Sequence, residues 1–478
     1  MPVTLVKSFE EPSDDTVEKE DRDKKTMGKT LSKWMFKNAN SVADMSEDRV
    51  QQVPGSLGLT LFNVMGLVKS GHLFYRNRRD RNKSNVYKVS IYQPRIVLCS
   101  FDGIRQMYEN TAVRKEPSFG MFVFNQEILG NHTPLIFEND EIHHQRRHIF
   151  IELSKKIFCN KNFINELSQS ISSELDHVID TMTSQPSSDF EDALSGAVGN
   201  VVTRCIVGKT IDNELLKKWM DNCLIKKFKK ARAEGPLVYE KIRQSVKEGP
   251  IFREFAAGLV KKNGLLEEDI CNEIIFALIF NAYKALHGFV VSALVHLSNL
   301  SEDKQIKLQN DASNFHQSTD KTTELNSATD VENYTLEIFR LFPPASFVFR
   351  RVTENFVLPL KSGNYQVNKD DLLCGNVYLS QRDPDIFDNP DKLDPDRFQR
   401  QPHLKDYLTC FGAPFLQDSV PNIHKCGGQK LALTFAKVFV MHLLTLRIEY
   451  DGQPSWSGKK IKRIIGSDKP VRVKAIRK

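Results

Sequence analysis

The sequence predicts a mainly α-helical protein with small β-sheets. Three observations support this fold class: long amphipathic runs with few prolines from about 141 to 341, an apolar segment of unusual length at 267–300, and short β-type stretches at 85–101 and within 347–377. Of the 478 residues, 40% are apolar and 27% are charged, which is the balance of a folded globular protein.

The chain begins with a charged segment over residues 1–30 that is poor in large apolar side chains, so we expect a disordered tail followed by one domain over 31–478. The moderately apolar stretch at 57–75 predicts a first helix with an apolar surface. The first β-type stretch alternates and is rich in Val, Ile and Tyr, which predicts two strands that turn at Gln93 and Pro94.

The apolar segment at 267–300 predicts a long helix buried through the middle of the molecule. Residues 301–330 are polar and lack a pattern, which predicts a loop or short surface helices. The C-terminal part then predicts a helix at 331–341, short strands, a meander rich in Pro and Asp at 382–402, and a final helix at about 427–446.

The net charge of +7 is spread along the chain, and its densest run is RNRRDRNK at 76–83. No aromatic residues interleave with this run, so it predicts a solvated loop or contact with an anionic membrane surface rather than a nucleic-acid site. The eight cysteines show no paired short spacing, which indicates reduced thiols. No window reaches the ~18 apolar residues that a membrane crossing requires. We therefore expect a cytoplasmic protein that is soluble or peripherally bound to a membrane.

Three motifs follow one another in the C-terminal third. Glu337 and Arg340 lie three residues apart, on one face of the predicted helix, and can pair. Arg397 lies in the meander, where a second guanidinium can join the pair in a buried network. Cys426 lies in the sequence KCGG, directly before the apolar segment LALTFAKVFVMHLL.

A cysteine at the start of a helix suits metal chemistry. The positive end of the helix dipole and nearby backbone N–H groups favour the thiolate of Cys426. The two glycines that follow allow the backbone to approach a flat ligand. A thiolate held in this way is a good haem ligand. Taken alone, the same residue is equally well explained as a structural cysteine in a turn.

Together the three motifs resemble the cytochrome P450 superfamily over roughly residues 50–460. The resemblance implies the cytochrome P450 fold, with haem b between the long central helix and the cysteine loop and with Cys426 as the iron ligand. It also implies that Glu337, Arg340 and Arg397 form a structural salt-bridge network.

The resemblance further places two arginines on the haem propionates, Arg147 in EIHHQRRHIF and Arg350, which lies ten residues after the arginine of the Glu-x-x-Arg motif. A guanidinium suits a carboxylate because it binds through two parallel hydrogen bonds. His424 would be a further propionate contact, although family members commonly carry Arg at this position.

Two departures from the superfamily pattern narrow the resemblance. The middle of the central segment, IFNAYKALH at 279–287, lacks the acid and the threonine of oxygen-activating members, and the loop at 411–425 is enlarged. Both features resemble the branch that rearranges fatty-acid hydroperoxides, namely allene oxide synthases, hydroperoxide lyases, divinyl ether synthases and epoxyalcohol synthases. Lys284 and Ala285 stand where that branch usually has two glycines, which marks a divergent member and leaves an animal-type enzyme open.

The branch implies a reaction without O2 or a reductase, because a fatty-acid hydroperoxide, supplied by a lipoxygenase upstream, carries its own peroxide. Homolysis of the O–O bond gives an alkoxyl radical that closes to an epoxide or breaks a carbon–carbon bond. We expect the Asn281 amide to orient the peroxide and Phe280 to pack against the carbon chain. Asn281 can instead satisfy a kink in the helix, and Phe280 can be a core residue.

The product follows from the fate of one radical, and the residues favour epoxyalcohol synthesis or lyase-type cleavage slightly over allene oxide synthesis. Two other functions stay open from the sequence. The first is an NADPH- and reductase-dependent monooxygenase or a prostacyclin-synthase-like isomerase that lacks the acid–threonine pair. The second is a non-enzymatic haem-binding protein. We expect no nucleic-acid partner.

Overall fold

The computed structural model describes residues 50–115, 132–185, 189–219, 228–263, 265–412, 425–452, 454 and 470–478. The chain divides into two compact units, Met1–Gln51 and Gln52–Lys478. The predicted tail over residues 1–30 lies outside the described residues. All elements considered below belong to the second unit, apart from the two-residue strand β1 (Gln51–Gln52), which spans the boundary.

Helices make up most of the described chain, as the sequence predicts. The α-helices are α2 (Thr60–Ser70), α3 (His72–Asn82), α4 (Phe101–Glu109), α5 (Asp140–Cys159), α6 (Phe163–Ser184), α7 (Phe190–Val207), α8 (Asn213–Lys218), α9 (Phe228–Lys247), α10 (Pro250–Asn263), α11 (Glu267–Phe276), α12 (Lys284–Leu297), α13 (Glu302–Gln317), α14 (Lys321–Ser327), α15 (Thr329–Leu341), α16 (Val377–Ser380), α17 (Arg397–Arg400) and α18 (Gln429–Leu443). Within this described part, no helix has the length and apolarity to span a membrane.

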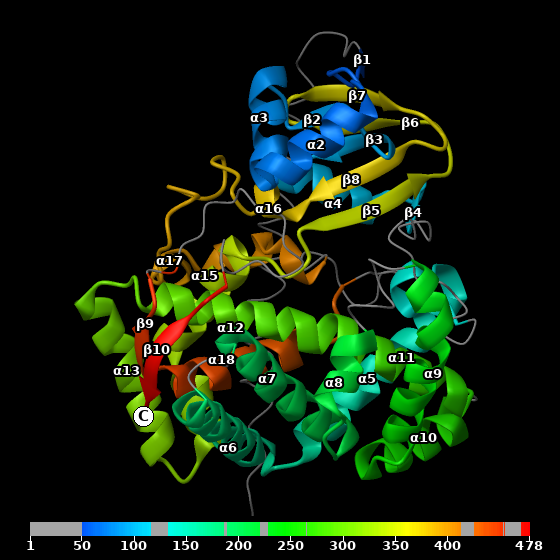
Figure 1. Ribbon diagram of the computed structural model, residues 1–478. Coiled ribbons are helices and arrows are strands. Elements are labelled where there is room, and N and C mark those ends of the chain that lie inside the picture. Colours follow the sequence, from blue (N-terminus) through cyan, green and yellow to red (C-terminus); the bar gives the residue numbers. More distant parts are fainter. Residues whose placement is uncertain are drawn as a thin grey trace, which may run out of the picture. The chain divides into compact units, whose positions relative to one another are not determined.

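The strands are short and join distant parts of the sequence. They are β2 (Val86–Ile91), β3 (Gln93–Leu98), β4 (Val113–Lys115), β5 (Phe347–Val352), β6 (Phe356–Leu360), β7 (Gly363–Val367), β8 (Leu372–Asn376), β9 (Arg447–Tyr450) and β10 (Val473–Arg477). The largest sheet has the order β2-β3-β8-β5-β4, in which β3 and β8 are parallel. The first β-type stretch and two strands of the second, β5 and β8, therefore form one sheet, which Figure 1 shows beside α2, α3 and α4. The other two strands of the second stretch, β6 and β7, pair with each other in a separate sheet.

The turn between β2 and β3 lies at Tyr92 rather than at the predicted Gln93 and Pro94. Ile91 pairs directly with Gln93, and Tyr92 adopts a positive φ of 63°. Pro94 lies inside β3, before the pairing with β8 begins at Ile96. A proline is tolerated there because its missing N–H costs no hydrogen bond on the unpaired side of the strand.

Two helical predictions also need correction. The stretch at 57–75 forms α2 and the start of α3, because Gly71 separates them with a φ of 57°. Of the two alternatives for the polar segment 301–330, a loop or short surface helices, the structure has helices, but α13 is longer than predicted, with 16 residues, and α14 is short. Leu308, Ala312 and Phe315 recur at i, i+4 and i+7 and are buried, so α13 packs by a narrow apolar stripe that its polar composition conceals.

The long central segment is helical from Glu267 to Leu297, as predicted, but it is not a uniform α-helix. The π-helix η5 (Ala277–Tyr283) lies between α11 and α12. Helix α12 is buried on nearly all sides and contacts α7, α15 and α18. Figure 1 shows it running lengthwise through the helical part. A π-helix of this kind is rare and commonly marks a functional site.

His72 makes the stability of the fold depend on pH. It is fully buried in a stack with Tyr378, with ring centroids 4.0 Å apart, and burial followed by the charges of Arg382 and Arg76 lowers its pKa to about 3. In the unfolded chain the His72 imidazole becomes protonated near pH 6.5, whereas in the folded chain it stays neutral until the pH approaches 3. The contribution of neutral His72 to the free energy of unfolding is therefore complete above pH 6.5 and is lost as the pH falls towards 3.

We therefore expect His72→Phe to flatten the fall in unfolding free energy between pH 6.5 and 4.5 by about 1 kcal/mol per pH unit. Urea unfolding followed by circular dichroism at several pH values measures this slope. The exposed His177→Gln serves as the control. A slope identical to that of the unmodified protein would show that His72 does not titrate in this way.

Candidate functional site

Cys426 lies in a tight backbone arrangement at the start of α18. Its N–H donates to the carbonyl of Phe411 (2.8 Å), and its own carbonyl accepts from the N–H of Gln429 (3.4 Å). A Cβ atom at Gly427 would lie 3.2 Å from the Cβ of Phe150 in α5. Glycine at this position therefore allows the cysteine loop to pack closely against α5.

The pKa of the Cys426 thiol is raised, whereas the position of this residue at the start of a helix predicts a lowered pKa. Part of the residue is exposed, yet the protein around the sulfur desolvates it, and this burial raises the pKa of the thiol. The N–H of Gly428 and the charge of Arg147 act in the opposite direction and are outweighed. The protein alone therefore favours the thiol, and a bound metal cation is needed to hold the thiolate.

Arg147, which the sequence predicts as a propionate contact, lies beside the cysteine loop. It comes from the middle of α5 and is 9% exposed. Its Nη1 atom donates to the carbonyl of Lys425, the residue before the cysteine, at 2.7 Å. The guanidinium therefore fixes the loop by a hydrogen bond and also contributes positive charge next to the sulfur.

Arg350, the second predicted arginine, belongs to a cluster of basic side chains that includes two residues the sequence did not single out, His143 and Lys115. It is buried, and its guanidinium lies over the ring of Tyr108 at 4.9 Å. His143 in α5 is buried near Lys115, Arg147 and Arg350, and burial together with these charges lowers its pKa to about 3. The pKa of Lys115 is also well below its ordinary value, because of burial and then Arg350. Such a concentration of desolvated positive charge suits an anion with more than one carboxylate.

A cavity of about 860 Å³ lies against the cysteine loop. Its walls come from α5, including His143, Arg147 and Phe158, from the loop residues on either side of Cys426, and from the first turns of α18. Among the described residues, none from the central helix lines this cavity. The described cavity thus lies on the side of the cysteine that faces α5 and α18.

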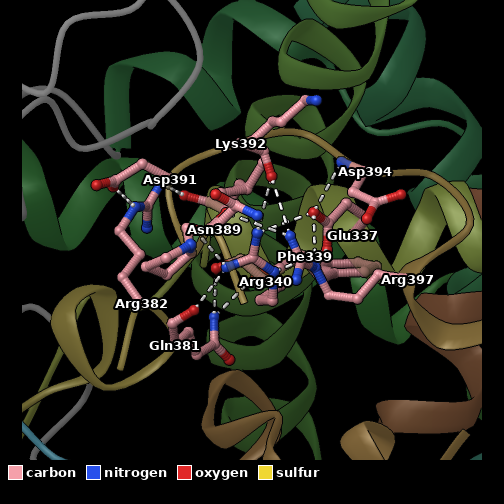
Figure 2. A network of polar contacts seen from close by, with 12 residues as sticks. Glu337, Phe339, Arg340, Gln381, Arg382, Asn389, Asp391, Lys392, Asp394 and Arg397 are labelled. Atoms are coloured by element: carbon pink, nitrogen blue, oxygen red, sulfur yellow. Dashed lines mark hydrogen bonds and ion pairs between the residues drawn. The ribbon is translucent and has the colours of Figure 1, made fainter. Parts of the chain in front are cut away.

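Glu337, Arg340 and Arg397 meet in one buried network, as predicted (Figure 2). Arg340 binds both carboxylate oxygens of Glu337, at 2.7 and 2.8 Å, and the Nε atom of Arg397 lies 3.2 Å from each of them. The side chain of Glu337 is 0% exposed. Burial of these charges is tolerated because each charge has several partners.

The remaining donors of the two arginines hold the meander. Arg340 donates to the carbonyls of Gln381, Pro390 and Lys392, and Arg397 donates to those of Asp388, Asn389 and Lys392. The N–H of Asp394 donates to Glu337 at 3.0 Å. The meander, which has little regular structure, is therefore fixed by Arg340 from α15 and by its own Arg397 in α17.

Gln381 links this network to the cysteine loop. Its Nε2 atom donates to the carbonyls of Phe339 (3.1 Å) and Arg340 (2.8 Å) at the end of α15. Its Oε1 atom accepts from the N–H of Cys410 at 2.9 Å, one residue before Phe411, whose carbonyl binds the N–H of Cys426. One buried amide thus connects α15 to the loop. A lone Gln in a meander carries no motif, so the sequence did not point to it.

The backbone of Phe280 and Asn281 lies within the π-helix η5, and the side chains of residues 279–281 lie outside what the structure describes. At the end of the π-helix, the Tyr283 hydroxyl bonds to that of Ser195 in α7 at 2.7 Å. His424, together with the segment 413–424 of the enlarged loop, also lies outside the described residues. The roles predicted for Asn281, Phe280 and His424 therefore stay predictions.

A family model described as Cytochrome P450 matches residues 303–452. An allene oxide synthase from Linum usitatissimum, described as chloroplastic, is 22% identical over 84% of this chain and 83% of its own length. A 9-divinyl ether synthase from Capsicum annuum is 20% identical over 82% and 91%. A chloroplastic fatty acid hydroperoxide lyase from Solanum lycopersicum is 26% identical over 46% of each chain.

Solved structures share the fold. The cyanobacterial CYP120A1 with bound retinoic acid superposes with a TM-score of 0.68 at 15% identity, covering 90% of this chain and 99% of its own. The ligand-free cytochrome P450 OleT reaches a TM-score of 0.66 at 16% identity, covering 89% and 99%. The likeness extends over nearly the full length of both proteins and confirms the predicted fold.

We predict that Gln381→Leu loosens the cysteine loop without unfolding the protein, because it removes three hydrogen bonds of one amide and keeps a side chain of similar size. The measurement is the absorption spectrum of the haem-loaded ferrous protein under CO, in which the thiolate-ligated band should decrease. The control is Gln305→Leu, which removes two carbonyl contacts next to α13. Equal spectra for both variants would contradict the positioning role of Gln381.

Proposed function

We propose that the chain is a member of the cytochrome P450 superfamily, and that it is a haem-thiolate enzyme that rearranges or cleaves hydroperoxides of polyunsaturated fatty acids. The observation that carries this proposal is the central helix. Residues 279–287 contain neither the acid nor the threonine of an oxygen-activating site, and a π-helix occupies this point. The similar allene oxide synthase, hydroperoxide lyase and divinyl ether synthase support the same reading.

The residues around Cys426 fit haem b. Cys426 supplies one sulfur donor, and a Gly428 N–H bonds to it. The cations Arg147, Arg350 and Lys115 are desolvated around His143 and suit the two propionates, with Lys115 added to the pair that the sequence predicts. When bound, the haem supplies a ferric centre able to homolyse the O–O bond of a hydroperoxide.

In this proposal the protein's own residues orient the substrate and direct its radical. The amide of Asn281 donates a hydrogen bond to the peroxide, and the ring of Phe280 packs against the hydrocarbon chain. No atom enters from O2 and no electron from a reductase, so the product is an isomer of the hydroperoxide, a pair of fragments that together have its composition, or a compound formed from it by loss of water. We favour epoxyalcohol formation or chain cleavage, with allene oxide formation as the alternative.

The substrate implies an upstream dioxygenation of a polyunsaturated fatty acid, which is the reaction class of a lipoxygenase. A cytoplasmic location stays a prediction from the sequence. Contact with a membrane surface is compatible with so apolar a substrate and belongs to the same proposal.

We expect Lys115→Met to weaken haem retention, because a buried carboxylate would lose a charge-assisted partner. Loss of this charge-assisted hydrogen bond should raise the rate of haem transfer to apomyoglobin about 10- to 100-fold. This transfer rate is the quantity to be measured. Lys88→Met is the matched control, since Lys88 is half-buried and lies in β2, at the opposite edge of the same sheet. An unchanged transfer rate in Lys115→Met would remove this residue from the cofactor site.

The purified haem protein is expected to consume a fatty-acid hydroperoxide without NADPH or reductase, and Asn281→Ala should lower the rate by about 10²-fold. Loss of the conjugated-diene absorbance measures the rate, and product analysis distinguishes epoxyalcohol, aldehyde and allene-oxide products. The control is Asn272→Ala in α11, whose amide accepts a hydrogen bond from Tyr239.

Two results would overturn the proposal in different ways. A strict requirement for NADPH would identify a monooxygenase. Normal haem binding without any hydroperoxide turnover would identify a haem-binding protein without this activity. If Asn281→Ala and Asn272→Ala both stay within a few-fold of the unmodified rate, the reaction stands but the role of the Asn281 amide is wrong.

A further inference from the structure

The outward face of α2 is apolar, which reverses the usual arrangement of a surface helix. Leu61, Met65 and Val68 recur at i, i+4 and i+7, and Phe62 lies beside them. Together with Leu59 they form what we call the α2 face, whose members are between 58% and 77% exposed. A helix that only covers the protein would present polar side chains to water at these positions.

The inward side of α2 is anchored, so the helix cannot turn the α2 face towards the protein. The buried amide of Asn63 donates to the carbonyls of Leu57 (2.7 Å) and Ser90 (2.8 Å). Val64 and Leu67 pack against the main hydrophobic core from the same side. Rotation of the helix would break both hydrogen bonds and expose this apolar contact.

Positive charge surrounds the α2 face. Residues 57–83 contain six Lys or Arg and one Asp, a net charge of +5 (six minus one) in a chain whose total is +7. Lys69 is exposed and directly follows Val68 at the end of the face, and Arg81 and Lys83 are exposed at the end of α3. Figure 1 shows α2 and α3 side by side, and the two helices are in contact.

We propose that the α2 face docks on an anionic lipid surface. Apolar side chains on one side of a short helix, flanked by Lys and Arg, match a helix that lies in the interface between headgroups and acyl chains. The basic residues are then placed near anionic headgroups. A protein partner is less well matched, because the α2 face contains no Tyr, Trp or Arg, the residues that dominate the centres of protein interfaces.

The test is sedimentation of the full-length haem protein with vesicles of phosphatidylcholine, with and without phosphatidylserine. We expect binding to the anionic vesicles that weakens as the salt concentration rises. The combined variant Leu61→Gln, Phe62→Gln, Met65→Gln and Val68→Gln should lower the partition coefficient at least tenfold. Removal of charge by Lys69→Gln, Arg81→Gln and Lys83→Gln should reduce binding to anionic vesicles only, by up to about fivefold for each cation.

A matched control removes exposed leucines elsewhere. Leu237 and Leu266 are 63% and 67% exposed and belong to α9 and to the segment before α11. The variant Leu237→Gln with Leu266→Gln should bind vesicles within a factor of two of the unmodified protein. Circular dichroism of both apolar variants verifies the fold, and the binding readout does not depend on hydroperoxide turnover.

Three results would overturn the proposal. The first is equal partitioning of the unmodified protein and the α2 variant, or no partitioning of either. The second is a concentration-dependent dimer, detected by sedimentation equilibrium, that the α2 variant abolishes while vesicle binding is absent; the occupant would then be a second copy. The third is a Phe62→Trp fluorescence signal that is blue-shifted without vesicles and is not quenched by brominated lipid, which would mean that the chain itself covers the face.

Discussion

The placement of the cysteine loop depends on the ion pairs that the buried carboxylate of Glu337 makes with Arg340 and Arg397. Arg340 and Arg397 neutralise this carboxylate and then extend to the carbonyls of the meander, while Gln381 connects the end of α15 to the loop before Cys426. Removing one member of a buried ion network typically costs about 3–5 kcal/mol, because the other charges stay buried without compensation. An irregular segment thus acquires a single conformation from side chains of a regular helix.

Two regions of the site suit ligand groups of opposite charge. The sulfur of Cys426 suits a cation, and the basic side chains around His143 suit an anion. Burial raises the pKa of the Cys426 thiol, so the thiolate lacks a partner cation. Around His143, by contrast, Lys115, Arg147 and Arg350 concentrate positive charge in a desolvated region. A cofactor that carries a metal cation at its centre and two carboxylates at its edge satisfies both regions at once. Iron protoporphyrin has this distribution of charge, which is why the same residues fit it.

Motifs made the contacts of Glu337, Arg340 and Arg397 predictable, because the chemistry of such a network requires fixed residue types at fixed spacing. Contacts without such a requirement were not predictable. Lys115 reaches the site because β4 pairs with β5, and Gln381 reaches it because the chain after α16 passes the cysteine loop. Neither arrangement can be inferred from the residues next to Lys115 or Gln381 in the sequence. The parallel pairing of β3 with β8 joins residues far apart in the chain. The sequence left a loop or short surface helices open where α13 lies, because three buried residues suffice to dock an otherwise polar helix.

The central helix shows how a local change of geometry serves a reaction at its midpoint. A π-helix contains an extra residue per turn relative to an α-helix, so it changes which side chains of the following turns face a given direction by about 100° per inserted residue. The segment η5 is flanked by α11 and α12, both of which are deeply buried, so packing on each side holds the irregular turn in place. The residues of the turn itself give up regular α-helical hydrogen bonding. The backbone of residue 281 lies within this turn, where we propose that the Asn281 amide orients the substrate.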